Sequence, residues 1–369
     1  MRDLTFEEVR DTVVGASVLG CGGGGELAEG LELVERARDE GLSFRLAGLD
    51  ELPDDAILAC AYAVGAMTMD ADDERYIGLP LAERHPTVLA VETLCEHTGS
   101  RLAGMIPGEL GATSVAEAFY PAAAFGLPVI DADPAGRAVP EMQHSTFFLE
   151  GLPIAPQAVV NEFGETLLLL KVLDDRRSEA LVRALAIASR NAVWVADHAL
   201  PAGRLRTATI PGTVSLALRV GQALRAAHER GEDLGDAVAV AGGGRVLFTG
   251  VIAKASWKDA DGFTYGEFTV AGEHAHTGHD LRVWFKNENL MAWRDKRPVV
   301  TVPDLICVID EETHVPVTNP NAREGMRVTV LAIPAPQQWL EPVALDVFSP
   351  RTFGFDLDYR PFSAWSADG

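Results

Sequence analysis

The chain has 369 residues, of which 47% are hydrophobic and 23% are charged, a composition typical of folded globular proteins rather than disordered ones. Domains usually hold about 100–200 residues, so we expect two. Acidic residues outnumber lysines and arginines by 54 to 31, which gives a net charge of −23. Such an acidic surface repels phosphate backbones and anionic lipid. We therefore expect a small-molecule substrate, and neither nucleic acid nor a membrane as a partner.

The four cysteines, Cys21, Cys60, Cys95 and Cys307, form no CxxC pair and show no regular spacing. This argues against a disulfide framework and against a structural zinc ribbon. The charged N-terminal stretch lacks the apolar run of a signal peptide, and no stretch approaches the roughly 18 apolar residues of a membrane span. We expect a cytoplasmic protein. Whether it forms a homo-oligomer is left open.

The first half of the chain alternates between helical and strand-like patterns. Thr5 and Glu8 form a capping box that predicts a first helix, which must end at the glycine run Gly22–Gly25 because glycine disfavours helix. A second helix follows the glycines. Further segments are expected as strands at 56–63, 102–106 and from 128, and as helices at 86–98 and 115–124. This alternation predicts an α/β domain with a mainly parallel sheet and helices on its faces.

The second half changes character. A hairpin is expected at 158–161 and 165–172, and helices at 178–190 and 213–229. From residue 242 onward, runs rich in Val, Ile, Phe and Thr alternate with turn residues, which predicts a barrel or sandwich. The expected strands lie at 245–255, 265–271, 281–285, 305–310 and 327–333. We place the N-terminal α/β domain at 1–170 and the C-terminal domain at 171–369, helical at 176–230 and β-rich at 243–369.

The glycine run is the most conspicuous local feature. A glycine loop that opens a helix can present backbone N–H groups to an anion or a carbonyl oxygen, so Gly22, Gly23, Gly24 and Gly25 are candidate substrate-binding residues. Cys21 beside them is a further candidate, although a small structural residue is the commoner role there. No Gly-Lys-Ser/Thr follows, as a Walker A loop requires, and no strand precedes the loop, as a dinucleotide fingerprint requires.

A second candidate is the loop that follows the strand near residue 130. It carries Asp131, Asp133, Arg137 and Glu141, with His144 three residues further on. Ligands of open α/β sheets bind at the carboxyl ends of strands, where this loop begins. The residue types supply a general base, a cation for a substrate carboxylate and metal ligands. The alternative is a solvated acidic loop held by an Asp–Arg pair.

Three further features are weaker. Glu109 and Thr113 lie at the next strand end, facing the same expected crevice, although Thr113 is also a candidate helix cap. The stretch Phe285–Asn289, with Asn287 at its centre, lies at the end of a strand. It is either an ordinary transition from strand to loop or a segment that faces the substrate. His274, His276 and His279 form an HxHxxH pattern. His274 and His276 would share one face of a strand and could bind a metal, although a polar surface turn is the commoner interpretation. His198 shows no partner in the sequence, and we expect it to be structural.

Several of these segments, in this order, resemble the S-methyl thiohydantoin desulfurase family, which is associated with hydantoinases. The segments that carry the resemblance are Leu19–Gly25, Gly126–Asp133, Gly136–Glu141, Lys286–Leu290, Pro303–Ile306 and Pro350–Gly354. The resemblance implies an N-terminal three-layer α/β domain and a C-terminal domain with a barrel-like β unit. It also implies a hydrolase that acts on a thio-substituted hydantoin ring, releases a thiol and leaves a hydantoin.

For that reaction the candidate catalytic residues are Asp131, Asp133, Glu141, His144 and Glu109. Arg137 would anchor a substrate carboxylate, and the glycine-loop amides would stabilise negative charge on the ring. Zinc could supply the nucleophile by lowering the pKa of a bound water, but no spacing in the sequence identifies a ligand set. The alternative function is a non-catalytic ligand-binding or accessory subunit of a hydantoinase system.

Overall fold

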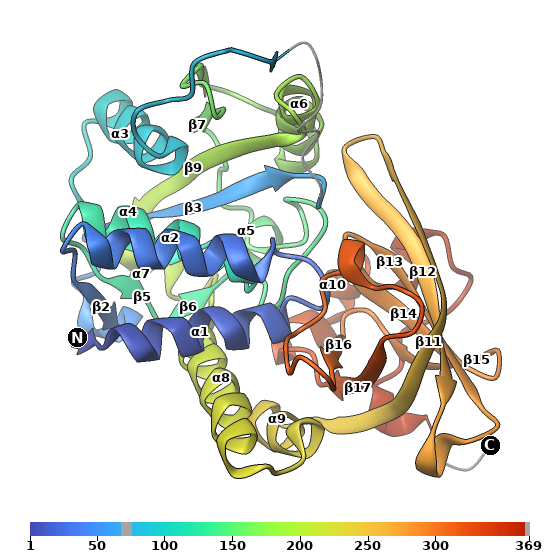
Figure 1. Ribbon diagram of the computed structural model, residues 1–369. Coiled ribbons are helices and arrows are strands. Elements are labelled where there is room, and N and C mark those ends of the chain that lie inside the picture. Colours follow the sequence, from blue (N-terminus) through green and yellow to red (C-terminus); the bar gives the residue numbers. More distant parts are fainter. Residues whose placement is uncertain (68–75, 366–369) are drawn as a thin grey trace.

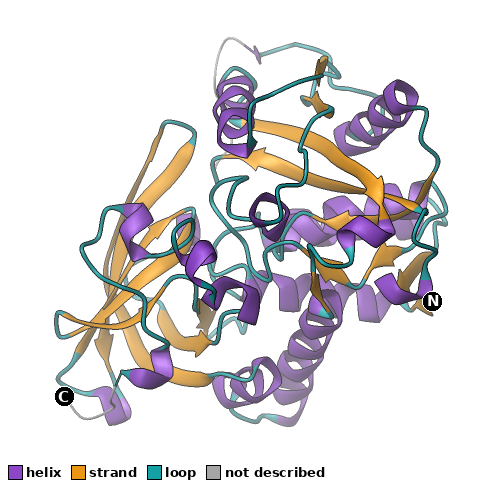
Figure 2. Cartoon of the chain, turned by 180° about the vertical axis from the view of Figure 1, so that it is seen from behind, coloured by secondary structure: helices purple, strands orange, loops and turns teal. Residues whose placement is uncertain are grey.

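The computed structural model describes residues 1–67 and 76–365. Two bodies are visible: a larger one of mixed helix and strand that holds the N-terminus, and a β-rich one that holds the C-terminal part (Figures 1 and 2). The expected fold class is confirmed, with a mixed α/β first half and a curled antiparallel sheet in the second half.

The first sheet has eight strands in the order β1-β2-β5-β4-β3-β9-β7-β8. Its central strands β2, β5, β4 and β3 are mutually parallel, whereas β1 and the β9-β7-β8 group are antiparallel to their neighbours. The strands are β1 (Arg2–Leu4), β2 (Phe44–Ala47), β3 (Ile57–Gly65), β4 (Leu102–Pro107), β5 (Val129–Ile130), β7 (Gln157–Val160), β8 (Thr166–Leu169) and β9 (Ala192–Pro201).

Helices cover both faces of this sheet. The predicted capping box is present, with Glu8 N bonded to Thr5 Oγ1 at 3.2 Å and Thr5 N to Glu8 Oε2 at 2.8 Å. One apolar cluster joins the sheet to α1–α4, and two others join it to α5, α6 and α7, which makes three layers. The helices are α1 (Phe6–Leu19), α2 (Leu27–Asp39), α3 (Pro86–Thr98), α4 (Ala112–Ala124), α5 (Thr146–Leu149), α6 (Asp175–Ile187) and α7 (Ala202–Leu205).

Two helices connect the bodies. Helix α8 (Thr213–Arg230) packs along α1, and α9 (Leu234–Gly242) leads from it to the second sheet. The α1–α8 crossing is so close that a Cβ atom on Gly15 would lie 1.8 Å from the carbonyl oxygen of Ala217. A glycine is therefore required at position 15, and the two helix backbones meet there directly.

The second sheet has seven antiparallel strands in the order β15-β14-β13-β12-β11-β17-β16 and encloses a core of its own. Beyond residue 245 the described helices are the four-residue α10 (Pro342–Leu345) and short 3-10 turns, in line with the β-rich prediction. A separate pair of short strands is β6 (Ala132–Asp133) with β10 (Ile210–Pro211). The seven strands are β11 (Arg245–Ala260), β12 (Phe263–Gly272), β13 (Asp280–Lys286), β14 (Glu288–Arg294), β15 (Arg297–Thr301), β16 (Leu305–Asp310) and β17 (Arg327–Ile333).

Strand β9 bears on the proposed division of the chain. It comes from the second half of the sequence, yet it lies between β3 and β7 of the first sheet. The division at residue 170 stays a prediction, since the first sheet draws one strand from beyond it. Across the described ranges, no helix is long and apolar enough to cross a membrane.

Candidate functional site

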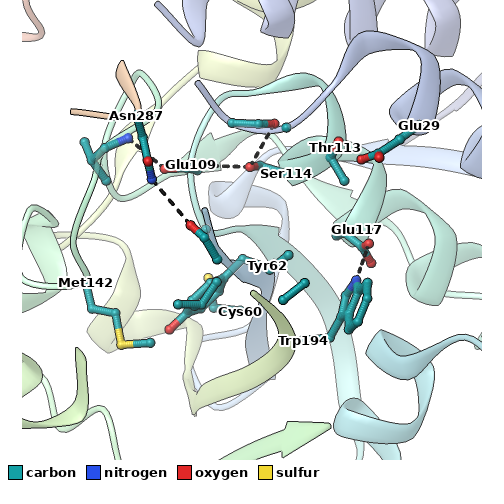
Figure 3. Close-up of a pocket in the computed structure, with 18 of the residues that line it drawn as sticks. Glu29, Cys60, Tyr62, Glu109, Thr113, Ser114, Glu117, Met142, Trp194 and Asn287 are labelled. Carbon is teal, nitrogen blue, oxygen red and sulfur yellow. Dashed lines mark hydrogen bonds between the residues drawn. The ribbon is translucent and has the colours of Figure 1, made fainter. Parts of the chain in front are cut away.

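A cavity of about 840 Å³ opens at the carboxyl ends of the parallel strands β3 and β4, where α/β sheets bind ligands. Several segments that are distant in sequence form its walls, among them the glycine loop, α2, the start of α4, the loop 134–145, β9, and the turn between β13 and β14. The glycine loop and the loop after β5 thus border one cavity, as the sequence led us to expect. Figure 3 shows part of this lining.

A β-bulge places a histidine on the cavity wall. In the β3–β9 pairing Leu58 is opposite Leu200 but Cys60 is opposite Asp197, so His198 and Ala199 together face one residue. His198 adopts a φ of +46°, a conformation that is uncommon outside glycine. Its Nδ1 lies 2.7 Å from Oδ1 of Asp197, while its buried Nε2 has no hydrogen-bond partner. The bulge therefore leaves a free imidazole nitrogen at a cavity-lining residue.

Asp197 is held by a network of neutral donors. The hydroxyl of Tyr62 donates to its Oδ2 at 2.6 Å, and Nε2 of Gln157 donates to the same oxygen at 2.9 Å. Gln157 in turn accepts from the hydroxyl of Ser178 on α6 at 2.7 Å. These bonds fix the carboxylate, and the carboxylate fixes the ring of His198.

Glu109 lies directly after β4 on the cavity wall. Its Oε1 accepts from the hydroxyl of Ser114 at 2.8 Å, and its Oε2 accepts from the amide of Val139 at 2.8 Å. Burial raises the pKa of Glu109 to about 7, against the lowering effect of these two bonds, and repulsion from Asp133 adds to the rise. Near neutral pH this carboxyl group can both give and take a proton.

A second carboxyl group reaches the cavity from the other sheet. Glu288 begins β14, is 2% exposed, and has an Oε2 with no hydrogen-bond partner. Burial raises its pKa well above the usual value, and the neighbouring Glu109 raises it further. The repulsion between the two carboxylates disfavours the state in which both are ionised.

The glycine loop is packed rather than open along most of its length. The amide of Asn289 donates to the carbonyl of Cys21 at 2.7 Å, and that of Thr113 donates to the carbonyl of Gly24 at 3.0 Å. Gly22 and Gly23 are absent from the cavity wall, whereas Gly24 and Gly25 line it. The carbonyl groups of the loop thus bind α4 on one side and the second sheet on the other. Of the four glycines, only Gly24 and Gly25 line the cavity and can contact a ligand.

Cys21 does not reach the cavity either. It is fully buried in the core cluster that also holds Cys307, and its Sγ donates to the carbonyl of Leu19 at 3.3 Å. Burial acts to raise the pKa of Cys21, but the neighbouring Cys307 thiol and the charge of Arg137 bring it down to about 7.

The two aspartates after β5 have structural partners. Asp131 accepts from the amide of Ser215 at 2.8 Å and from its hydroxyl at 2.6 Å, at the start of α8. Asp133 is fully buried and accepts from the amides of Ala135 at 2.9 Å and Gly136 at 2.8 Å. Burial raises its pKa to about 6. Neither aspartate lines the cavity.

Arg137 is fully buried and bonds to backbone carbonyls instead of facing a ligand. Its guanidinium donates to the carbonyls of Ala138, Pro303, Asp304 and Asn289 at 2.9–3.2 Å. All but one of these carbonyls belong to the second sheet and its loops. The expected carboxylate anchor is therefore a cross-link between the two halves of the fold.

Glu141 lines the cavity and pairs with Lys286, while Nε2 of Gln143 donates to it at 2.5 Å. Burial acts to raise its pKa, but the charge of Lys286 and the hydrogen bonds from Lys286 and Gln143 hold the value below the usual one. His144 is 3% exposed and packs against Phe348, with ring centroids 4.7 Å apart. Burial lowers its pKa to about 3, so His144 stays neutral and lies behind the wall.

The remaining expected binding residues do line the cavity. Asn287 forms the β13–β14 turn with a φ of +56°, and its Oδ1 accepts from the amide of Thr264 at 2.8 Å. Thr113 donates to the carbonyl of Glu26 at 3.2 Å. Both are labelled in Figure 3, on different sides of the cavity.

The histidines of the HxHxxH pattern do not converge. His276 stacks on Phe248 with ring centroids 4.5 Å apart, and Nδ1 of His279 contacts Asp295 at 2.5 Å. Within residues 1–67 and 76–365, no group of three or more His, Cys, Asp or Glu side chains is arranged to hold a metal ion. Zinc thus remains an untested expectation with no ligand set in the described part of the chain.

Two family models together span nearly the whole chain. The S-Me-THD-like N-terminal domain matches residues 7–171, and the S-Me-THD-like C-terminal domain matches residues 173–362. The chain belongs to the S-Me-THD-like family. Membership supports a thiohydantoin-related role. A crystal structure of a protein from Chromobacterium violaceum is similar in fold, with a TM-score of 0.76 at 23% identity, covering 98% of this chain and 100% of that chain. No curated protein matches.

In this S-Me-THD-like protein the sequence pointed to Glu109, Thr113, Asn287 and the glycine loop, but it missed the Asp197–His198 pair. Adjacent residues of a regular strand point to opposite faces, so their cooperation depends on the bulge. The only available signal was the charged Asp-His step in an otherwise apolar run.

Proposed function

We propose that the protein hydrolyses an S-methyl thiohydantoin-type ring to the hydantoin and a thiol. The observation that carries this proposal is that one cavity contains a proton acceptor, His198, and proton donors, Glu109 and Glu288. Family membership supports the choice of ring. The reaction needs both groups, because water must lose a proton as it attacks and the products must regain it.

His198 acts as the general base. Asp197 accepts a hydrogen bond from Nδ1, so Nε2, which has no hydrogen-bond partner, carries the lone pair that takes a proton from water. The water attacks the ring carbon that bears sulfur. The C–O bond forms as the ring C=N electrons move to nitrogen.

Glu109 acts as the general acid. It protonates the ring nitrogen, which makes the carbon more electrophilic. When the tetrahedral adduct collapses, its hydroxyl returns a proton to Glu109 and the C–S bond breaks. The departing thiolate takes up the proton held by His198, either directly or through Glu288, which His198 then reprotonates. One water is consumed, one thiol is released, and the ring carbon gains its carbonyl oxygen without any change of oxidation state.

The direct test is turnover by the purified protein alone. Thiol release from an S-methyl thiohydantoin is followed with a thiol-reactive dye, and hydantoin formation is followed by chromatography. His198→Gln should reduce kcat by about 10²–10⁴-fold, whereas His97→Gln, at the exposed end of α3, should not. An accessory subunit would bind the ring and release no thiol, and full activity of His198→Gln would refute the assignment of the base.

A further inference from the structure

Strand β8 forms one border of the first sheet. Among the described strands its only partner is β7, which Figure 1 places beyond β9 at the upper end of the first body. An open edge pairs readily with another strand, and natural proteins usually protect it with charges, prolines or bulges. The run Thr166–Leu170 has neither a charge nor a proline, and its pairing with β7 is regular. The outer side of β8 is therefore an unprotected edge.

The backbone of β8 directs polar groups toward this open side at alternate residues. At the closed end of the β7–β8 hairpin, the amide of Asn161 donates to the carbonyl of Glu165 at 3.2 Å. In an antiparallel pair, residues that bond to the neighbouring strand alternate with residues whose N–H and C=O groups point away from it. Counted from Glu165, the residues that point away are Thr166, Leu168 and Leu170.

The side chains along this edge are apolar and exposed. The segment 77–81 lies beside the hairpin, since the amide of Ala82 donates to the carbonyl of Glu162 at 2.8 Å. Of the fifteen large apolar side chains that are exposed in the described residues, seven belong to 77–81 and 167–173, so they form a patch and are not scattered. The four that follow the hairpin turn are 38–86% exposed, and they are Leu167, Leu168, Leu170 and Leu173.

The charges at the two ends of the run are complementary under two-fold symmetry. Glu165 and Lys171 lie equally far from Leu168, on either side of it. If β8 pairs antiparallel with its own copy around Leu168, Glu165 faces the partner's Lys171, and opposite charges across a strand pair stabilise it. The same register sets the outward groups of Thr166 opposite those of the partner's Leu170, so the backbone bonds and the charges favour one alignment. Two chains of net charge −23 repel each other, and this run is locally neutral.

We infer that two copies of the chain associate through β8, antiparallel and centred on Leu168, so that their first sheets join into one continuous sheet. A two-fold contact uses the same surface of both copies, and main-chain hydrogen bonds supply affinity as they do when a strand is added to a sheet edge. The inference does not depend on the proposed function, because β8 does not line the cavity.

The mass in solution tests the association. Light scattering of the full chain should rise from 39.5 kDa toward twice that value as the concentration increases from about 1 to about 100 μM, the range expected for a modest interface. Amide hydrogen exchange across 166–170 should slow over the same range. A chain that stays monomeric throughout, or that dimerises without slower exchange at 166–170, overturns the inference.

Charge reversal tests the register. Lys171→Glu, at an exposed position, sets two glutamates opposite each other in both symmetry-related pairs, so we expect the dissociation constant of the dimer to rise about tenfold or more. Adding Glu165→Lys should restore the affinity, because the pairs then form again with their charges exchanged. Lys258→Glu, at an exposed position of β11, changes the net charge equally and should leave the dissociation constant almost unchanged.

Leu168→Lys is the stronger disruption, because it sets two lysines opposite each other at the symmetry axis. This variant should be monomeric up to about 100 μM, and its circular dichroism should match that of the parent. If Leu168→Lys and Lys171→Glu dimerise as tightly as the parent, the copies meet elsewhere and the inference fails. A folded double variant that binds no better than Lys171→Glu alone overturns the register centred on Leu168, and with it the proposed pairing.

Discussion

Gly23 and Glu288 lie so close that a Cβ atom on residue 23 would fall 2.0 Å from Oε1 of Glu288. The glycine loop follows α1, and Glu288 belongs to the second sheet, so this contact holds the second carboxyl group at the cavity. Gly23 has no positive φ, so space rather than backbone conformation requires glycine there.

We therefore expect Gly23→Ala to displace Glu288. Stability should fall by about 1–3 kcal/mol, the usual cost of overpacking, and thiol release should fall at least tenfold. Gly41→Ala is the control, because Gly41 has a φ of +75° and nothing within 4 Å of its added Cβ. It should lose stability without losing activity. Equal activity of the two variants would show that the position of Glu288 does not matter to the reaction.

Replacing Asp197 with Asn should damage the reaction more than the fold. The amide can still accept from Tyr62 and Gln157, but it can favour the tautomer of His198 that carries the proton on Nε2. We expect kcat to fall about 10²–10⁴-fold with the melting temperature changed little. A loss that appears in KM alone would contradict this account.

The stability of the protein should depend on the proton of Glu109. The folded chain binds this proton with a pKa of about 7, compared with a usual value of 4.5. Its contribution is therefore complete below about pH 4.5 and is lost as the pH rises through about 7. The glutamine of Glu109→Gln has no proton to lose. The free energy of unfolding of the variant relative to the wild type should therefore rise by about 1–3 kcal/mol as the pH increases over this range. Urea midpoints at pH 4.5, 6 and 7.5 would measure the gain, and a constant difference would contradict it.

Arg137 should matter to stability rather than to substrate affinity. Lysine cannot reproduce the bonds from one guanidinium to four carbonyls, so we expect Arg137→Lys to cost about 3 kcal/mol or more. Arg10→Lys, at an exposed position of α1, should cost almost nothing. A raised KM with unchanged urea midpoint would instead favour the role expected from the sequence, as an anchor for a substrate carboxylate.

Local patterns were sufficient for most of the framework. The Thr5–Glu8 capping box, the glycine stop after it, and the alternating β-runs beyond residue 242 are short-range signals, and the structure follows them. Strand β9 was missed because its run combines Trp, Asp and His, and the bulge interrupts its alternation. Its place in the sheet is set by pairing with β3 and β7, which is long-range information.

The residues of the candidate site were harder to predict from the sequence than the fold. Glu109 could be predicted because it lies just after the end of a strand. Asp131 and Arg137 are also charged residues that follow a strand, but Asp131 bonds to Ser215 and Arg137 bonds to backbone carbonyls. Whether a charged side chain faces a cavity or satisfies buried backbone depends on which segments pack against it. No periodicity in a single sequence contains that information.

The position of β9 also limits how genes for such chains can recombine. The segment that matches the N-terminal family model ends at residue 171. In the sheet that this segment forms, β3 and β7 are connected through β9, which comes after that residue. Asp197 and His198 come with that strand. An exchange of gene segments at this junction would combine the first sheet of one parent with the β9 strand, and therefore the histidine, of the other parent. Such hybrids should be active only where both parents have the bulge. The two segments must therefore evolve together.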